Sequence, residues 1–282
     1  MAGNNIIVVF DFDKTIIECD SDYWVVQQMG ATKLFHQLLF TIPYFNTIMR
    51  KMMKKLHKQG KSIDEIVEVL KQIPIHPRVI PAIKAAHALG CDLRIISDAN
   101  MFSIETMLKH FGVREYFSEI NTNPSFVDEK GTLIIEPFHN FRNSSHGCTT
   151  NTCSPNMCKG LVIERIKACD EGKNKRIIYV GDGRNDYCPS LKLKENDFAM
   201  PKKNFPLWDL ICSNPLLIKA KIHEWSNGDE FEKVLLRLIN SICSGDDIKS
   251  VLSSADFIRP NHQVVPVSRY RWDKDPWSSD DD

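Results

Sequence analysis

Residues 6–15 read Ile-Ile-Val-Val-Phe-Asp-Phe-Asp-Lys-Thr, and this stretch decides the fold. Its first five residues are apolar and mostly β-branched, which is typical of a central parallel strand buried on both faces. Alternate residues of an extended chain point the same way, so the carboxylates of Asp11 and Asp13 are expected to converge. Two such charges are costly unless a cation lies between them or one holds a proton. The pair therefore indicates chemistry, with an acidic turn in which Thr15 caps the next helix as the alternative.

Length and composition favour one large core with an insertion. The chain has 282 residues, of which 43% are hydrophobic. Lys and Arg together number 36, as do Asp and Glu, so no net charge attracts nucleic acid or an anionic membrane. No window reaches the roughly 20 apolar residues that span a bilayer, and the N-terminus lacks a secretory pattern. We therefore expect a cytoplasmic protein that binds neither nucleic acid nor membrane, and the sequence leaves its oligomeric state open.

Strand-like and helical segments alternate along the chain. Buried strands are expected at 6–11, 92–97 and 176–180, separated by amphipathic helices. This alternation predicts an α/β fold with a doubly wound, mostly parallel sheet and right-handed crossovers. A hairpin is expected between 117–121 and 132–135, on either side of a turn rich in Asp, Lys and Gly.

The segment after the first strand has a different character from the rest. Residues 21–89 are rich in Met, Leu and Lys with helical spacing, and we interpret them as a helical cap inserted into the core. Ser62 and Glu65 within it form a capping-box pattern. The catalytic core would then comprise residues 1–20 and 90–245. Residues 246–282 lose periodicity and are expected to form a flexible tail.

Three of the expected strands end in chemically useful side chains. They are Asp11 and Asp13 after the first, Ser97 and Asp98 after the second, and Asp182 and Asp186 after the third. In doubly wound sheets the carboxyl ends of the strands border the ligand crevice, so these groups should meet in space. Lys159 opens a helix between the second and third strand ends; a solvated lysine is the alternative interpretation there.

The order and type of these residues resemble the four motifs of the haloacid dehalogenase superfamily. Those motifs are Asp-x-Asp-x-Thr, a Ser at a strand end, a Lys, and Gly-Asp-x-x-x-Asp, here Asp11-Asp13-Thr15, Ser97, Lys159 and Gly181-Asp182-Asp186. The resemblance implies a Rossmann-like core and a phosphatase that uses Mg²⁺, a cation that takes hard oxygen ligands and shares them with phosphate.

The resemblance also implies a role for each residue. Asp11 would be the nucleophile that forms an aspartyl-phosphate, and Asp13 the acid that protonates the leaving oxygen and later activates water. Ser97 and Lys159 would bind the phosphoryl oxygens. The Mg²⁺ ligands would be Asp11, the backbone carbonyl of Asp13, Asp182, and Asp186 either directly or through water.

Finer resemblance narrows the substrate. The segments that carry it are Ser21-Asp22, Ser97-Asp98-Ala99-Asn100, residues 153–160, and residues 181–189 with Tyr187-Cys188-Pro189. Over about residues 5–240 the chain resembles the phosphoethanolamine/phosphocholine phosphatase family, whose plant branch includes pyrophosphatases and thiamine monophosphate phosphatases. The resemblance implies that Asp22 and Asp98 meet the substrate ammonium, with Thr15 as a further substrate-binding residue. Asp22 and Asp98 as helix caps are the alternative, and Asp20 is a weaker third candidate.

These patterns lead to a main functional hypothesis with two alternatives. We expect a Mg²⁺-dependent phosphatase acting on phosphoethanolamine or phosphocholine; a pyrophosphatase or thiamine monophosphate phosphatase would use the same residues. Arg184, where small residues are often found, could bind a second phosphate. A receiver-like or catalytically silent binding protein is the alternative from another class. Asp13 argues against it, because an acid/base beside the nucleophile is needed for rapid turnover.

The cysteines indicate a reducing compartment. There are nine, an odd number, and most are scattered through apparent helices and strands. Cys148, Cys153 and Cys158 are instead spaced by four residues, with His146 nearby. Three thiols and an imidazole could bind zinc. Reduced structural cysteines or an oxidisable pair are the alternatives.

Overall fold

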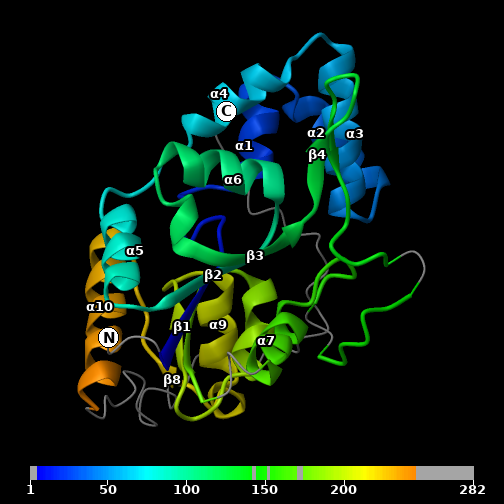
Figure 1. Ribbon diagram of the computed structural model, residues 1–282. Helices are drawn as coiled ribbons and strands as arrows, with labels where there is room; N and C mark the ends of the chain where they lie inside the picture. The colour runs from blue at the N-terminus through cyan, green and yellow to red at the C-terminus, as the bar shows by residue number, and fades with distance from the viewer. Residues whose placement is uncertain (1–4, 142–143, 151–152, 170–173, 246–282) are drawn as a thin grey trace.

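The computed structural model describes residues 5–141, 144–150, 153–169 and 174–245, and its centre is a parallel sheet (Figure 1). Its strands are β1 Ile6–Phe10, β2 Asp92–Asn100, β3 Phe117–Asn123, β6 Arg176–Gly181, β7 Phe198–Pro201 and β8 Lys221–Ile222. They lie in the order β3-β2-β1-β6-β7-β8, and each neighbouring pair is parallel. The predicted doubly wound parallel sheet is confirmed.

Helices cover both faces of this sheet, which explains why every residue of β1 is buried. Ile6, Val8 and Phe10 pack into one apolar core, whereas Ile7 and Val9 pack into the other. The helices of the first face are α5 Val79–Ala88, α6 Met101–His110 and α10 Gly228–Ser244. Those of the second face are α7 Lys159–Ala168, α8 Tyr187–Leu191 and α9 Pro206–Ser213. Short 3₁₀ turns are η2 Arg114–Tyr116, η3 Arg184–Asp186 and η4 Pro215–Leu217.

A group of four helices follows β1 and lies at the top of Figure 1. They are α1 Ser21–Gln28, α2 Thr32–Thr41, α3 Phe45–Lys58 and α4 Ile63–Lys71. The predicted capping box starts α4: the Ser62 hydroxyl accepts from the Glu65 N–H, and the Glu65 carboxylate accepts from the Ser62 N–H. Helix α5 falls within the predicted cap, 21–89, yet packs against α10 and β2 beside the sheet. The division into core and cap stays a prediction, and residues 246–282 lie outside the described residues.

The hairpin exists, but its first arm differs from the prediction. It is formed by β4 Ser125–Val127 and β5 Leu133–Ile135, which pair antiparallel. Residues 117–121 instead belong to β3, which pairs in parallel with β2 and forms one edge of the main sheet. The hairpin packs against α3, where Arg50 and Glu136 form an ion pair at 3.2 Å.

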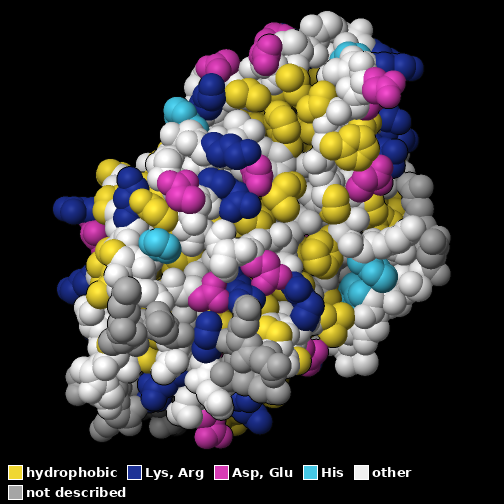
Figure 2. Space-filling model, viewed as in Figure 1, with side chains coloured by type: hydrophobic (Ala, Val, Ile, Leu, Met, Phe, Trp, Pro, Cys, Tyr) yellow, Lys and Arg dark blue, Asp and Glu magenta, His cyan; other side chains and the backbone are white. Residues whose placement is uncertain are grey.

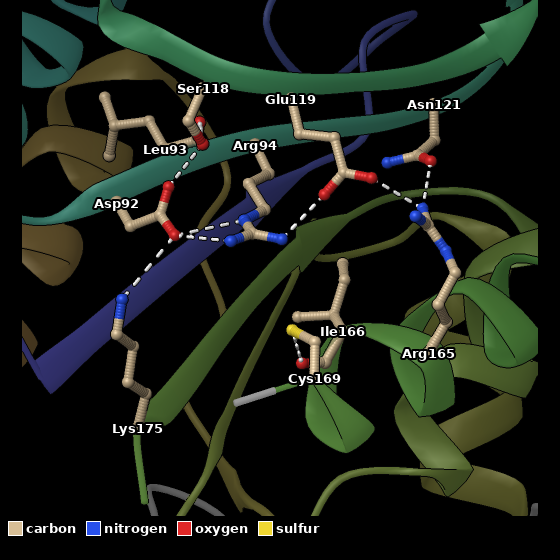
Figure 3. A network of polar contacts seen from close by, with 10 residues as sticks. All are labelled: Asp92, Leu93, Arg94, Ser118, Glu119, Asn121, Arg165, Ile166, Cys169 and Lys175. Carbon is tan, nitrogen blue, oxygen red and sulfur yellow. Dashed lines mark hydrogen bonds and ion pairs between the residues drawn. The ribbon is translucent and has the colours of Figure 1, made fainter. Parts of the chain in front are cut away.

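A charged network joins β2, β3 and α7 (Figure 3). The buried Arg94 guanidinium donates to Asp92 at 2.7 and 3.1 Å and to Glu119 at 2.6 Å. Arg165 of α7 donates to the other oxygen of Glu119 at 2.6 Å and to Asn121. A buried guanidinium is stable only when its charge is paired, and here Asp92 of β2 and Glu119 of β3 both pair with it, which links the two strands. Through Arg165 the network also holds α7 against the sheet.

On the face shown in Figure 2, charged side chains of both signs are interspersed among the described residues. This distribution agrees with the balanced composition, in which 36 basic and 36 acidic residues leave no net charge. Within the described part of the chain, no helix combines the length and the apolar character needed to cross a bilayer.

Candidate active site

The carboxyl ends of three neighbouring strands, β1, β2 and β6, bring the predicted residues to one edge of the sheet. Asp11 follows β1 and Asp182 follows β6. Ser97 and Asp98 lie near the end of β2, which continues to Asn100 rather than ending at the serine. The strand order reverses at β1: β2 and β3 lie on one side of it and β6, β7 and β8 on the other, and ligands bind at such switch points in open α/β sheets.

Lys159 lies between two of the carboxylates. Its side chain is buried at the first position of α7, with Nζ 2.8 Å from Asp11 Oδ2 and 2.8 Å from Asp186 Oδ1. Burial would lower the pKa of Lys159, but the charges of Asp11 and Asp186 outweigh burial and raise it. The lysine is therefore a charged, paired group inside the site, and the solvated alternative is wrong.

Asp186 is fully buried and accepts hydrogen bonds on both oxygens. Besides the lysine, the Tyr179 hydroxyl donates to Oδ1 at 2.6 Å. The backbone N–H groups of Asp182 and Gly183 donate to Oδ2 at 3.1 and 2.9 Å. A Cβ on residue Gly181 would lie 2.6 Å from this carboxyl, so glycine allows the close approach. Sequence reasoning missed Tyr179, because a tyrosine inside an apolar strand resembles an ordinary core residue.

Two hydroxyl groups lie beside the carboxylates. The Thr15 hydroxyl donates to Asp182 Oδ1 at 2.9 Å, so it orients one of the acidic groups. Ser97 is buried, and its oxygen accepts a hydrogen bond from the Ala99 N–H at 3.2 Å. That bond orients the serine hydroxyl, which lies three residues before the end of β2.

The acidic cluster carries more negative than positive charge. Oxygens of Asp11, Asp182 and Asp186 all lie within 4.8 Å of one another, and the buried Lys159 pairs with Asp11 and Asp186. Burial together with the charge of Asp186 raises the pKa of Asp182 to about 7, and burial raises that of Asp11 as well. A divalent cation would remove this repulsion, and an all-oxygen set of hard ligands fits magnesium.

Asp13 is half-buried and turned toward the start of α1. Its Oδ1 accepts from the Ser21 N–H at 3.2 Å. Burial, followed by the charges of Asp20 and Asp22, raises the pKa of Asp13 well above its ordinary value. The protonated form, which can donate to a leaving group, is therefore favoured here.

The start of α1 supplies two further carboxyl groups near Asp13, those of Asp20 and Asp22. Asp20 caps the helix by accepting from the Tyr23 N–H at 2.8 Å, so the interpretation of Asp22 as the cap is wrong. Asp22 is buried, accepts from the Asn100 amide at 3.0 Å, and has its pKa raised to about 7 by burial and by Asp20. The Ser21 hydroxyl is also buried and has no hydrogen-bond partner among the described residues.

Asp98 is held by two asparagines. The side-chain amides of Asn185 and Asn156 donate to its two oxygens at 2.7 and 3.4 Å. The cap of α6 is Asn100, which accepts from the Ser103 N–H at 3.0 Å, so the interpretation of Asp98 as a helix cap is wrong too. Asp98 remains partly exposed at the edge of the site.

Four thiols gather outside this acidic cluster: Cys148, Cys153, Cys158 and Cys188. The last was missed, because it follows the final motif and shares no spacing pattern with the others. His146 stays outside the group of sulfurs. Its Nδ1 accepts from the Cys148 N–H at 3.1 Å, and its Nε2 donates to the Ser154 carbonyl at 3.0 Å.

Proteins of similar sequence carry phosphatase names. The family described as "Putative Phosphatase" matches residues 6–239. An Arabidopsis thaliana protein named inorganic pyrophosphatase 2 is 59% identical over 257 residues, which cover 89% of this chain and 91% of that protein. The phosphoethanolamine/phosphocholine phosphatase of Homo sapiens is 30% identical over 246 residues, covering 83% of this chain and 90% of that protein.

The fold has relatives among solved structures. A substrate-bound phosphoserine phosphatase matches with a TM-score of 0.52 at 15% identity, covering 80% of this chain and 96% of the other. At this identity the likeness shows the fold alone, and that fold is the haloacid dehalogenase-like core expected from the motifs.

Proposed function

The chain belongs to the family described as Putative Phosphatase, and we propose that it hydrolyses a small phosphomonoester through an aspartyl-phosphate on Asp11. It is a phosphatase of the haloacid dehalogenase type. One observation carries the mechanism: Asp11 lies buried at a strand end, 2.8 Å from a buried lysine and among two further carboxylates. Such a constellation is costly for stability and suits a site that must bind phosphate and cation together.

The proposed cofactor is Mg²⁺. Its ligands would be the carboxylates of Asp11 and Asp182 and the backbone carbonyl of Asp13. Asp186 already accepts four hydrogen bonds, so we assign it to support through water rather than to direct coordination. When bound, the metal would offset the charge of the phosphoryl oxygens and of the nucleophile.

The proposed reaction has two steps. In the first, Asp11 forms a bond to phosphorus while the bond from phosphorus to the leaving oxygen breaks, and Asp13 gives that oxygen its proton. In the second, Asp13 takes a proton from water, which displaces Asp11 and releases phosphate. Lys159 and Ser97 would bind the phosphoryl oxygens throughout, and the raised pKa of Asp13 favours the protonated form that the first step needs.

The leaving group would lie beside Asp13, where the surroundings are acidic. Asp20 and Asp22 both act on Asp13 electrostatically, and the unpartnered Ser21 hydroxyl lies next to them. A small ammonium-bearing alcohol would pair with these groups, so we propose phosphoethanolamine or phosphocholine as substrate, with Asp22 and Asp98 as head-group contacts. A direct contact of Thr15 with substrate stays a prediction, since its hydroxyl donates to Asp182.

Pyrophosphate is the second candidate. It is favoured by the 59% identity to the Arabidopsis thaliana protein of that name. With a pKa of about 7, Asp22 could be neutral and would then not repel an anionic leaving group. Arg184, at the start of η3, is the candidate contact for a second phosphate.

A single substrate panel tests both candidates. Phosphate release would be measured with Mg²⁺ for phosphoethanolamine, phosphocholine, pyrophosphate and thiamine monophosphate under one condition. We expect the amino alcohol esters to give the highest kcat/KM, and Asp22→Asn to lower that value for them more than for pyrophosphate. If pyrophosphate is the substrate, Arg184→Ala should lower kcat/KM for pyrophosphate more than for the amino alcohol esters. Inactivity toward all four compounds would contradict the proposal and favour a non-turnover binding protein.

We also propose that the protein works in the cytoplasm. All nine cysteines are free, and the Sγ atoms of Cys153 and Cys158 are only 3.4 Å apart. Such thiols stay reduced most readily in a reducing compartment. Cell fractionation or imaging of a fluorescent fusion would check this, and recovery from a secretory compartment would contradict it.

A further inference from the structure

We propose that Cys148, Cys153, Cys158 and Cys188 form a structural zinc site, separate from the phosphatase site. One sulfur from each residue lies within 4.8 Å of all the others. Four of the Sγ–Sγ distances are 3.7 Å (148–153), 3.7 Å (148–188), 3.4 Å (153–158) and 3.7 Å (158–188). Cys148 and Cys153 lie in the irregular segment between β5 and α7, Cys158 lies at its end, and Cys188 lies in α8. Tertiary structure therefore brings the four sulfurs together.

These distances fit tetrahedral coordination. With Zn–S bonds of about 2.3 Å, neighbouring sulfurs of a tetrahedral Cys₄ site are about 3.8 Å apart. The measured values, 3.4–3.7 Å, lie close to that spacing and far beyond the roughly 2.05 Å of a disulfide. A disulfide would use two of the sulfurs and leave two thiols beside it. A soft, closed set of four sulfurs is the arrangement of a structural zinc site.

The segment that carries three of the ligands has little regular secondary structure in its described residues. Between β5 and α7, the described residues of 136–158 include neither helix nor strand. Loops of this length without secondary structure are uncommon in compact domains unless something fixes them. A zinc ion bound by Cys148, Cys153 and Cys158 and anchored to α8 through Cys188 would do so, because metal binding supplies folding free energy.

The surroundings of the sulfurs resemble the outer shell of a metal site. The Thr150 hydroxyl lies 3.1 Å from the sulfur of Cys148, 3.5 Å from that of Cys153 and 3.2 Å from that of Cys188. The backbone N–H of Leu161 in the first turn of α7 donates to the Cys158 sulfur at 3.4 Å. Such donors stabilise thiolates and orient them toward a metal.

The site would also position catalytic groups. Cys158 immediately precedes Lys159, and Cys188 follows Asp186 by two residues. A Cβ on Gly160 would lie 2.5 Å from the Cys188 sulfur, so glycine lets the start of α7 approach α8 this closely. Zinc would therefore hold together the two backbone segments whose side chains meet at 2.8 Å in the active site.

Metal analysis of the full chain tests the proposal. Protein made without a polyhistidine tag and purified without chelators would be analysed by inductively coupled plasma mass spectrometry. We expect one zinc per chain in the wild type, in Asp182→Asn, and in the matched control Cys212→Ser on α9. Cys158→Ser and Cys188→Ser should lose the metal. Zinc lost from Asp182→Asn but kept by the cysteine variants would place it in the acidic cluster and overturn the proposal.

A second measurement keeps the test decisive if the cysteine variants do not fold. X-ray absorption at the zinc edge of the wild type should show four sulfur neighbours at about 2.3 Å. Oxygen or nitrogen neighbours, or a zinc-free protein that takes up no added zinc, would contradict the site. Peptide mapping that found a Cys153–Cys158 disulfide in freshly prepared protein would also contradict it.

Discussion

The acidic cluster and the cysteine cluster are built in opposite ways, although both lie near the start of α7. The acidic cluster takes Asp11 and Asp182 from the ends of adjacent strands, so the sheet itself determines their separation. The cysteine cluster takes three of its four residues from a segment whose described residues include neither helix nor strand. The acidic groups are buried, whereas Cys148 and Cys153 are only half-buried.

The difference teaches how each cluster relates to a metal. A rigid sheet can hold repelling carboxylates in place, so strand pairing sets the positions of Asp11 and Asp182. The four sulfurs of the cysteine cluster, three from the irregular segment and one from α8, form a closed set that keeps no position for substrate. The first cluster would therefore use a metal for catalysis and the second would use one for folding.

The sharpest way to separate the two clusters is to remove the nucleophile. Asp11→Asn keeps the size of the side chain but cannot form the aspartyl-phosphate, so we expect phosphate release to fall by roughly 10⁴-fold. Zinc content should stay at one per chain. Steady-state assays measure the first effect and metal analysis the second, with Asp209→Asn on the exposed face of α9 as control. Activity above a tenth of the wild type would contradict the role of Asp11.

The buried lysine tests whether the acidic cluster is held together by charge. Lys159→Met leaves Asp11 and Asp186 without their cation, and breaking a buried ion pair costs about 3–5 kcal/mol of unfolding free energy. Urea unfolding, with and without Mg²⁺, measures this loss. Lys109→Met removes an exposed pair with Glu105 and should cost less than about 1 kcal/mol. Equal effects of the two variants would show that the lysine is not structurally coupled to the carboxylates.

The pH dependence of stability tests whether the pKa of Asp22, which lies outside the proposed metal ligands, is raised. Its pKa of about 7 in the folded chain exceeds the unfolded value of about 3.9, so folding binds the proton and stability falls as pH rises between those values. Asp22→Asn removes this dependence. The unfolding free energy of the variant minus that of the wild type should increase by on the order of 2 kcal/mol as the pH rises from about 5 to 8. A constant difference across that range would rule out the raised pKa.

The smallest expected effect concerns the outer shell of the cysteine cluster. Thr150→Val keeps the shape but removes the hydroxyl beside three sulfurs, so zinc affinity should fall about tenfold. Competition with a chromophoric chelator measures it, and Thr41→Val on the exposed side of α2 is the control. Phosphatase activity at saturating zinc should not change. An unchanged affinity would mean that the hydroxyl does not support the thiolates.

Local patterns predicted the sheet and its strand ends well. The apolar run before Asp11 and the one before Asp182 are both strands, since burial on two faces leaves a continuous hydrophobic signature. The hairpin was placed incorrectly because residues 117–121 could pair in either of two ways, and only contact with β2 decides between them. Tyr179 was missed for the same kind of reason, since its partner Asp186 is not visible from the strand pattern.

By itself the sequence determined that two aspartates follow a buried strand and that a Gly-Asp motif follows another, because hydrophobic periodicity and motif spacing are local properties. Only the tertiary structure decided that Lys159 lies between Asp11 and Asp186, and that asparagines hold Asp22 and Asp98. It alone added Cys188 to the three spaced cysteines and excluded His146. These contacts join segments that are distant in the sequence, and packing between such segments has no local signature in the chain.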